Sequence, residues 1–175
     1  MPAASYWQAL AWIHSATPKC DRALYRRVKT TMPQRIVELG VGDLSRATRV
    51  IAMAQRYRKD TIHYCGIDLF DARSEDASLK LKDAHIRLSQ TGARIRLVPG
   101  DLMSAIPRTA NMLTNTDLLI VDATHSVSEL ESIRPFIPRM LGPCASIARY
   151  DVNNGKLQLR WMKPDSFQLP CRRAA

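Results

Sequence analysis

The stretch RIVELGVGDLSRATRV, residues 35–50, decides the fold of this chain. A short apolar run ends in Glu38, and Gly40 and Gly42 follow it one residue apart. The run is too short for a helix, whereas apolar residues recur at helical spacing from Ala47 onward. Glycine lets a backbone turn tightly and lets a ligand approach it closely. The stretch therefore predicts a strand, a glycine turn and a helix whose unpaired N–H groups face the turn.

Strands and helices keep alternating further along the chain. Strands are expected at 62–70, 93–101, 116–123 and 145–152, and helices at 47–60, 75–90, 104–113 and 126–141. Asn154-Gly155 is a hairpin turn signal, and the residues after it alternate apolar with polar. This order predicts an α/β fold: a Rossmann-like doubly wound, mostly parallel sheet with helices on both faces and a C-terminal antiparallel hairpin.

A chain of 175 residues is most simply one domain, and no Pro/Gly/Ser-rich linker divides it. Within it we expect an N-terminal helical cover (1–33), an α/β core (34–150) and a shortened C-terminal hairpin and tail (151–175). In the cover, Trp7, Ala11 and Trp12 look like one face of a helix. No apolar run is long enough to span a bilayer, so no membrane partner is expected.

The chain is strongly basic: 26 Lys and Arg against 16 Asp and Glu give a net charge of +10. Such an excess attracts anionic partners, although the cations are scattered and no known nucleic-acid-binding signature is present. The 4 cysteines form no C-x-x-C pair and have no histidine at metal spacing. We therefore expect free thiols, a cytoplasmic location and no bound metal.

Acidic residues stand at the ends of four predicted strands: Glu38, Asp68, Asp101 and Asp122. Any one of them alone is most simply a helix cap or a turn residue. Parallel strands, however, end at one edge of the sheet, where ligands bind in open α/β folds. Four acids at that edge indicate a ligand with several hydrogen-bond donors.

A dinucleotide site needs a third glycine, and Ser45 stands in its place. A pyrophosphate would also meet Glu38 and Asp43. A nicotinamide-dependent reductase is therefore disfavoured.

The pattern resembles the class I S-adenosylmethionine-dependent methyltransferases over about residues 35–150. VELGVGD looks like the first motif of that family. The resemblance implies that S-adenosyl-L-methionine is the cofactor. It also implies that Gly40 and Gly42 pass close to the methionine part, with Glu38 near its amino group.

Three further motifs match in order. GIDLF looks like the second motif, and implies that Asp68 accepts both ribose hydroxyls, with Leu69 beside it in the cofactor site. A carboxylate suits a vicinal diol because it has two acceptor oxygens. PGDLM resembles the third motif, and implies that Asp101 lies near the adenine amino group and Leu102 packs on the ring. LLIVDATHS looks like the fourth, in which Asp122 faces the cofactor or the substrate.

Two features depart from the family pattern. Leu44 replaces the usual third glycine, which is expected to narrow the turn. After the fifth strand the chain passes almost directly into the Asn154-Gly155 hairpin, so a helix of the family is missing. In the family, the C-terminal part of the chain often forms a wall of the acceptor site. Its shortening here implies either that the substrate is large or that activity has been lost.

His125, three residues past Asp122, is the candidate catalytic base. The alternative is that it packs against the helix that begins beside it. Asp122 with Asp151 and Asn153 weakly resembles the site of metal-dependent methyltransferases, but a hairpin turn explains Asn153 and Asn154 better.

Two functions remain open from the sequence. The first is a methyltransferase that acts by in-line displacement on an acceptor that is a small molecule or RNA. The alternative is a non-catalytic Rossmann-like module that binds nucleic acid or a partner protein through its basic surface.

Overall fold

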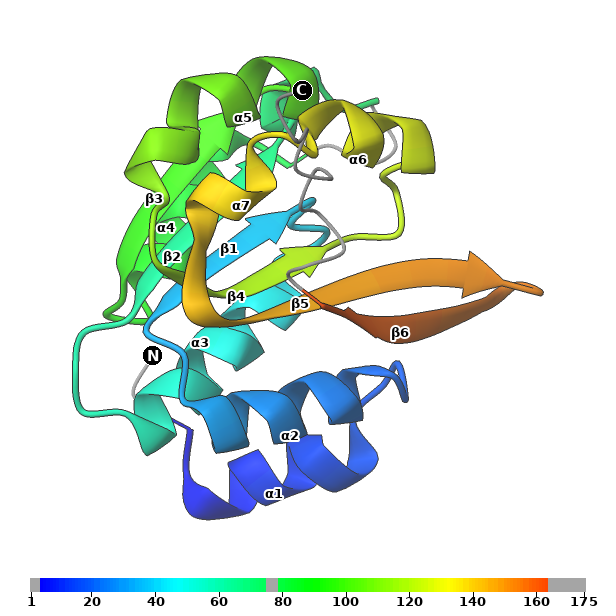
Figure 1. Ribbon diagram of the computed structural model, residues 1–175. Helices are drawn as coiled ribbons and strands as arrows, with labels where there is room; N and C mark the ends of the chain where they lie inside the picture. The colour runs from blue at the N-terminus through cyan, green and yellow to red at the C-terminus, as the bar shows by residue number, and fades with distance from the viewer. Residues whose placement is uncertain (1–3, 75–78, 164–175) are drawn as a thin grey trace.

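The computed structural model describes residues 4–74 and 79–163. Its centre is a six-stranded sheet in the order β3-β2-β1-β4-β5-β6 (Figure 1). The strands are β1 (Arg35–Leu39), β2 (His63–Asp68), β3 (Arg94–Pro99), β4 (Thr116–Val121), β5 (Leu141–Asn153) and β6 (Lys156–Met162). All neighbouring strands are parallel except β5 and β6, which pair antiparallel. The predicted doubly wound sheet with a C-terminal hairpin is confirmed.

Helices cover both faces of the sheet. They are α1 (Tyr6–Ser15), α2 (Asp21–Thr31), α3 (Ser45–Tyr57), α4 (Leu81–Ser89), α5 (Leu102–Thr109), α6 (Val127–Ile133) and α7 (Ile137–Met140), with short 3-10 turns at Phe70–Ala72 and Ala110–Met112. One apolar core lies between one face of the sheet and the four helices α1, α2, α3 and α4. A second core lies between the other face and helices α5, α6 and α7. No helix of the described residues is long and apolar enough to cross a membrane.

Strand β4 shows why a run without alternation becomes a central strand. Leu118 and Ile120 belong to the core beneath α1 to α4, whereas Leu119 and Val121 belong to the core beneath α5 to α7. Since both faces are covered, apolar side chains are needed at all four of these positions. The same strand pairs β1 on one side and β5 on the other.

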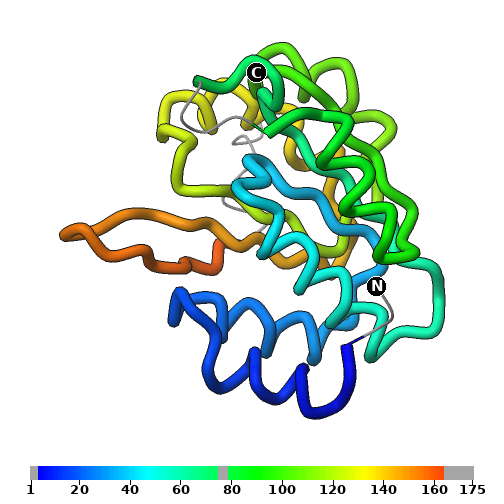
Figure 2. Tube along the Cα trace, turned by 180° about the vertical axis from the view of Figure 1, so that it is seen from behind, coloured from blue at the N-terminus to red at the C-terminus, as the bar shows by residue number. Residues whose placement is uncertain are grey.

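The hairpin of β5 and β6 extends away from the rest of the sheet (Figures 1 and 2). Its turn lies at Asn154 and Gly155, both with positive φ, as the sequence predicted. β5 begins at Leu141, four residues earlier than expected, because its first residue pairs with Thr116 across an irregularity in the register.

Helix ends follow the local signals. Ser126 and Glu129 form the predicted capping box of α6, and the expected interruption by proline separates α6 from α7. The helix expected at 75–90 begins at Leu81, while residues 75–78 lie outside the described residues.

The predicted face of the first helix is wrong. The buried residues of α1 are Ala9 and Ile13, whereas Trp7 is 77% exposed. Trp12 is half-buried and its ring centroid lies 6.3 Å from that of Tyr25. Apolar side chains occur on more than one side of this helix, and those of Ala9 and Ile13 are the ones that are buried, so the apolar pattern alone does not identify the buried face.

Candidate functional site

A cavity of about 710 Å³ lies at the carboxyl edge of the sheet, where β1, β2, β3 and β4 end. This volume is in the range of small-molecule sites. The candidate catalytic base His125 lines it, and so do all of the residues predicted for the cofactor except Glu38: Gly40, Gly42, Asp68, Leu69, Asp101, Leu102 and Asp122. Its other lining residues include Asp43, Arg73, Leu79, Arg87, Thr124 and Glu129. Residues far apart in the sequence therefore meet at one hollow.

The glycine turn forms one wall of the cavity. Gly40 has a φ of 80°, and a Cβ there would lie 2.7 Å from the Cβ of Asp122, so a larger residue would not fit. Gly42 has a φ of 55° and open space around it. Leu44 also adopts a positive φ, of 71°, which costs roughly 1–2 kcal/mol for a residue with a Cβ. Its side chain is fully buried in the core and does not line the cavity, so it leaves the hollow open.

Glu38 lies beneath the cavity rather than in its wall. It is fully buried, and Arg46, from the first turn of α3, donates from Nε to its Oε1 at 2.6 Å. The hydroxyl of Tyr64 donates to the other oxygen at 2.6 Å. Arg46 also donates from Nη2 to Asp122 Oδ2 at 2.7 Å. The acid of the first motif is thus satisfied within the chain, where the resemblance implied contact with an amino group.

Arg46 is the centre of a buried charged cluster. Burial raises the pKa of Glu38, while Arg46 and Tyr64 act in the opposite direction. Burial would lower the pKa of Arg46, but the carboxylates of Glu38 and Asp122 outweigh it and raise this pKa. The guanidinium carbon lies 4.5 Å from the ring centroid of Tyr150, whose hydroxyl donates to the buried Asp21 at 2.6 Å. Helix α2 is therefore linked to the site through β5.

Asp68 is held by a second arginine. Arg73 donates from Nε to Asp68 Oδ1 at 2.7 Å and from Nη2 to Oδ2 at 2.6 Å. It also donates from Nη1 to the carbonyl of Gly42 at 2.9 Å. The N–H of Val41 donates to Asp68 Oδ2 at 2.8 Å. Burial opposes ionisation, yet the hydrogen bonds from Arg73 and Val41 lower the pKa of Asp68. The carboxylate is therefore charged, and both of its oxygens are in use.

The remaining acids each have a local role as well. Asp101 is the N-cap of α5 and accepts from the N–H of Ser104 at 2.8 Å. Asp122 accepts from the N–H of Thr124 at 3.0 Å through the oxygen that Arg46 does not contact. Both side chains still line the cavity.

His125 carries an unsatisfied nitrogen at the glycine turn. Its Nε2 is buried and has no hydrogen-bond partner among the described residues. This atom lies 3.1 Å from the place that a Cβ on Gly40 would take. Burial lowers the pKa of His125 below its ordinary value of 6.5, so the ring is neutral at pH 7. A neutral imidazole with a free nitrogen is able to accept a hydrogen bond or a proton.

The carboxylates do not form a metal site in the described part of the chain. No group of three or more His, Cys, Asp or Glu side chains is close enough there to hold an ion. Asp151 instead pairs with Arg149 at 2.8 Å on the β5–β6 hairpin.

Comparison with known proteins finds likeness in structure alone. No family model and no curated protein sequence matches significantly. Among solved structures, the O-methyltransferase TomG from Streptomyces achromogenes, in complex with SAM, has a TM-score of 0.54 at 14% identity, over 80% of this chain and 58% of that one. Cofactor-bound Rv0187 from MTB has a TM-score of 0.53 at 15% identity, over 86% and 57%. The methyltransferase domain of bacterial CtHen1 has a TM-score of 0.50 at 15% identity, over 75% and 63%.

The chain therefore has the Rossmann-like fold of the class I S-adenosylmethionine-dependent methyltransferases. It spans 57% to 63% of the length of these three structures.

Proposed function

We propose that the chain binds S-adenosyl-L-methionine in the cavity at the carboxyl edge of the sheet and transfers the methyl group to an acceptor. One observation carries this proposal: a cavity of about 710 Å³ beside the glycine turn gathers Asp68, Asp101 and Asp122 from three strand ends. The likeness to TomG, whose structure is a complex with SAM, supports the same ligand.

The residues of the cavity fit this cofactor in their chemistry. Asp68 offers two carboxylate oxygens to the ribose hydroxyls. Asp101 and Leu102 follow the neighbouring strand β3 and serve the adenine, the first as an acceptor and the second as apolar surface. The free Nε2 of His125, with no partner among the described residues, is the kind of buried polar atom that a ligand would satisfy.

Arg73 must leave Asp68 when the ribose binds. It now donates to both oxygens that the hydroxyls would use. The side chain is 15% exposed, lines the cavity and also donates to the carbonyl of Gly42. Binding of the cofactor thus replaces the two hydrogen bonds from Arg73 to Asp68 with two from the ribose hydroxyls.

Arg46 is a positioning residue in this account. Its ion pairs fix Glu38 and the cavity acid Asp122 in place, and its bond of 3.2 Å to the carbonyl of Gly40 fixes the turn. Glu38 therefore acts on the ligand through Arg46 rather than by direct contact.

S-adenosyl-L-methionine, when bound, would supply a methyl group on a sulfonium sulfur: an acceptor nucleophile would bond to the methyl carbon in line as the carbon–sulfur bond breaks, with the thioether S-adenosylhomocysteine as the leaving group. The protein then has to align the acceptor and exclude water. Neutral His125 is placed to accept a proton from a hydroxyl or amine acceptor, if the acceptor loses one. The acceptor is either a small molecule or RNA, as the basic charge suggests.

Thermal unfolding tests the proposed ligand. S-adenosyl-L-methionine at 100 times its Kd is expected to add about 2.7 kcal/mol to the free energy of unfolding. For a chain of this length that is a rise in Tm of roughly 5–11 °C. NADH at the same concentration is expected to leave Tm unchanged. A rise with NADH and none with the methyl donor would contradict the proposal.

A further inference from the structure

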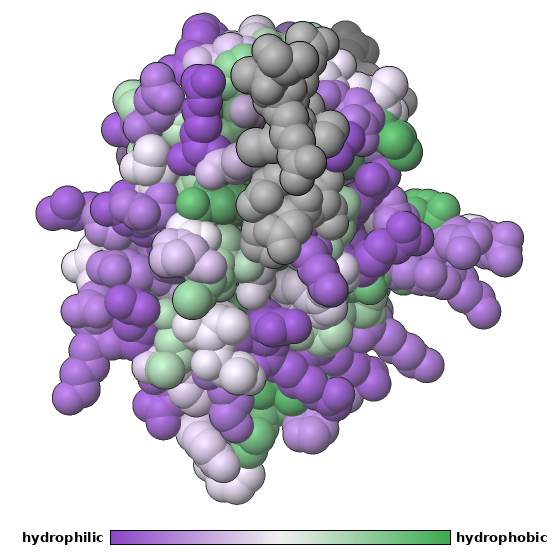
Figure 3. All heavy atoms as spheres, in the orientation of Figure 1, coloured by the Kyte–Doolittle hydropathy of each residue, from purple (hydrophilic) through white to green (hydrophobic). Residues whose placement is uncertain are grey.

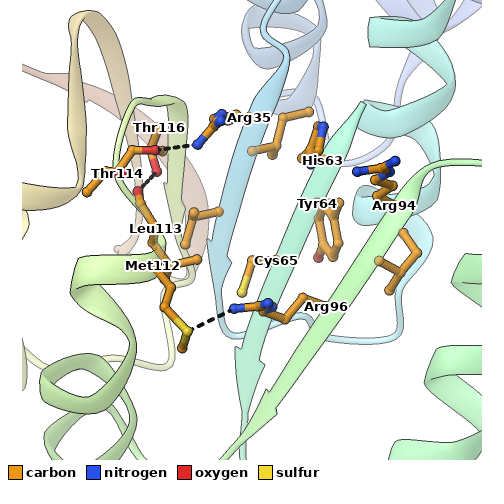
Figure 4. Close-up of a pocket in the computed structure, with 13 residues that line it drawn as sticks. Arg35, His63, Tyr64, Cys65, Arg94, Arg96, Met112, Leu113, Thr114 and Thr116 are labelled. Carbon is orange, nitrogen blue, oxygen red and sulfur yellow. Dashed lines mark hydrogen bonds between the residues drawn. The ribbon is translucent and has the colours of Figure 1, made fainter. Parts of the chain in front are cut away.

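A second cavity, of about 380 Å³, lies at the opposite edge of the sheet, where β1, β2 and β3 begin (Figure 4). None of its lining residues lines the first cavity. Its polar wall consists of Arg35, His63, Arg94 and Arg96. The facing wall consists of Met112, Leu113, Thr114 and Thr116.

Strand register places two of these arginines and His63 in one row. Arg35 on β1 is aligned with His63 on β2, which is aligned with Arg94 on β3. Aligned residues of parallel strands share a face of the sheet, and neighbouring strands lie about 4.8 Å apart. The row is therefore about 10 Å long. Arg96 adds a further guanidinium two residues along β3, level with Cys65.

The charges of this cavity are not balanced. Among the described residues that line it there is no Asp or Glu. None of Arg35, Arg94 and Arg96 forms an ion pair in the described part of the chain, in contrast to the arginines around the first cavity. The nearby Asp117 is already used, because its carboxylate accepts from the backbone N–H groups of Gln34 and Arg35.

Two of the arginines donate hydrogen bonds to uncharged acceptors. Arg35 donates to the carbonyl of Thr114 at 2.9 Å, and Arg96 donates to the sulfur of Met112 at 3.2 Å (Figure 4). A thioether is a weak acceptor, so most of the hydrogen-bonding capacity of Arg96 stays available. The pKa of His63 is lowered by burial and then by Arg94 and Arg35, as expected in a region of positive potential.

We propose that this cavity binds the phosphate groups of an anionic ligand. Guanidinium groups form paired hydrogen bonds with phosphate oxygens. A row about 10 Å long suits a ligand with more than one phosphate. Either a free polyphosphate compound or the backbone of single-stranded RNA supplies that chemistry. The phenol ring of Tyr64 in the lining is buried and therefore not available to stack on a base, so we expect the site to contact phosphates rather than bases. Figure 3 shows hydrophilic side chains interspersed with apolar ones over one face of the molecule.

Binding measurements with two probes test this inference. Tripolyphosphate is titrated by calorimetry, and a fluorescent oligouridylate of roughly 12 nucleotides by anisotropy. The test variant is Arg94→Gln/Arg96→Gln, since both side chains are exposed and removing their charge does not affect the core. The matched control is Arg26→Gln/Lys156→Gln, which removes the same charge at exposed positions outside the cavity.

The test variant is expected to bind the effective probe about tenfold more weakly, and the control within about twofold of the unchanged protein. If the oligouridylate is the effective probe, its salt dependence should also fall by roughly 1.4 in slope for two lost contacts. Binding of tripolyphosphate identifies a free compound as the source, and binding of the oligouridylate alone identifies RNA. No binding of either probe, or equal losses in both variants, would overturn the inference. Binding of S-adenosylhomocysteine should be the same in all variants, so this test is separate from the proposed function.

Discussion

Replacement of Arg46 by methionine is expected to lower the free energy of unfolding by about 3–5 kcal/mol, the range seen when a buried ion pair loses one partner. Glu38 is completely buried and Arg46 is its only cationic partner among the described residues. Without the guanidinium, the carboxylate must either stay charged in an apolar region or take up a proton. Urea-induced unfolding at pH 7 measures the loss.

Arg160→Met is the matched control for this measurement. Arg160 is 76% exposed and its Nε lies 3.9 Å from Asp151, so its ion pair should contribute less than about 1 kcal/mol. Adding Glu38→Gln to Arg46→Met is expected to restore part of the stability, because it removes the unpaired charge. An Arg46→Met protein as stable as the Arg160→Met protein would show that the buried cluster is not held by Arg46.

Asp68→Ala is expected to weaken the binding of S-adenosylhomocysteine at least about tenfold. Two hydrogen bonds to a charged acceptor contribute about 1.5–3 kcal/mol each, displacement of Arg73 offsets up to about 1.4 kcal/mol of that gain, and 1.4 kcal/mol is tenfold in Kd. Titration calorimetry measures the change. Asp83→Ala removes an exposed acid of α4 outside the cavity and is expected to leave Kd unchanged.

Arg73→Ala separates the ribose contact from general damage to the site. Because Arg73 occupies both oxygens of Asp68, its removal is expected to tighten binding, by up to about tenfold. Changes of opposite sign in the two variants would identify Asp68 as the acceptor and Arg73 as its competitor. Equal weakening by both would mean that Arg73 itself holds the ligand.

The sheet could be predicted from the sequence because its signals are local and agree with one another. The apolar β4, the glycine turn after β1 and the Asn154-Gly155 hairpin each specify one conformation. The helix α1 has no such single pattern, since Trp7 and Ile13 are both apolar and only packing decides which is buried.

The acids of the site could be predicted, but their partners could not. Carboxylates at strand ends have a fixed place once the sheet is parallel. Arg46 and Arg73 are two of 26 basic residues, and most such residues are solvated. One clue was available: Arg46 lies eight residues after Glu38, at the start of the helix that the glycine turn directs back over the strand. Leu44 was expected to narrow the glycine turn. It has a positive φ, and its side chain lies in the apolar core instead.

The most direct test of the account is a calorimetric titration of the unmodified chain with S-adenosylhomocysteine, which shares the adenosyl group that the cavity is proposed to hold. We expect one binding site with a Kd in the micromolar range, equivalent to about −8 kcal/mol at 1 μM. The absence of any heat of binding at millimolar ligand would contradict the proposed site.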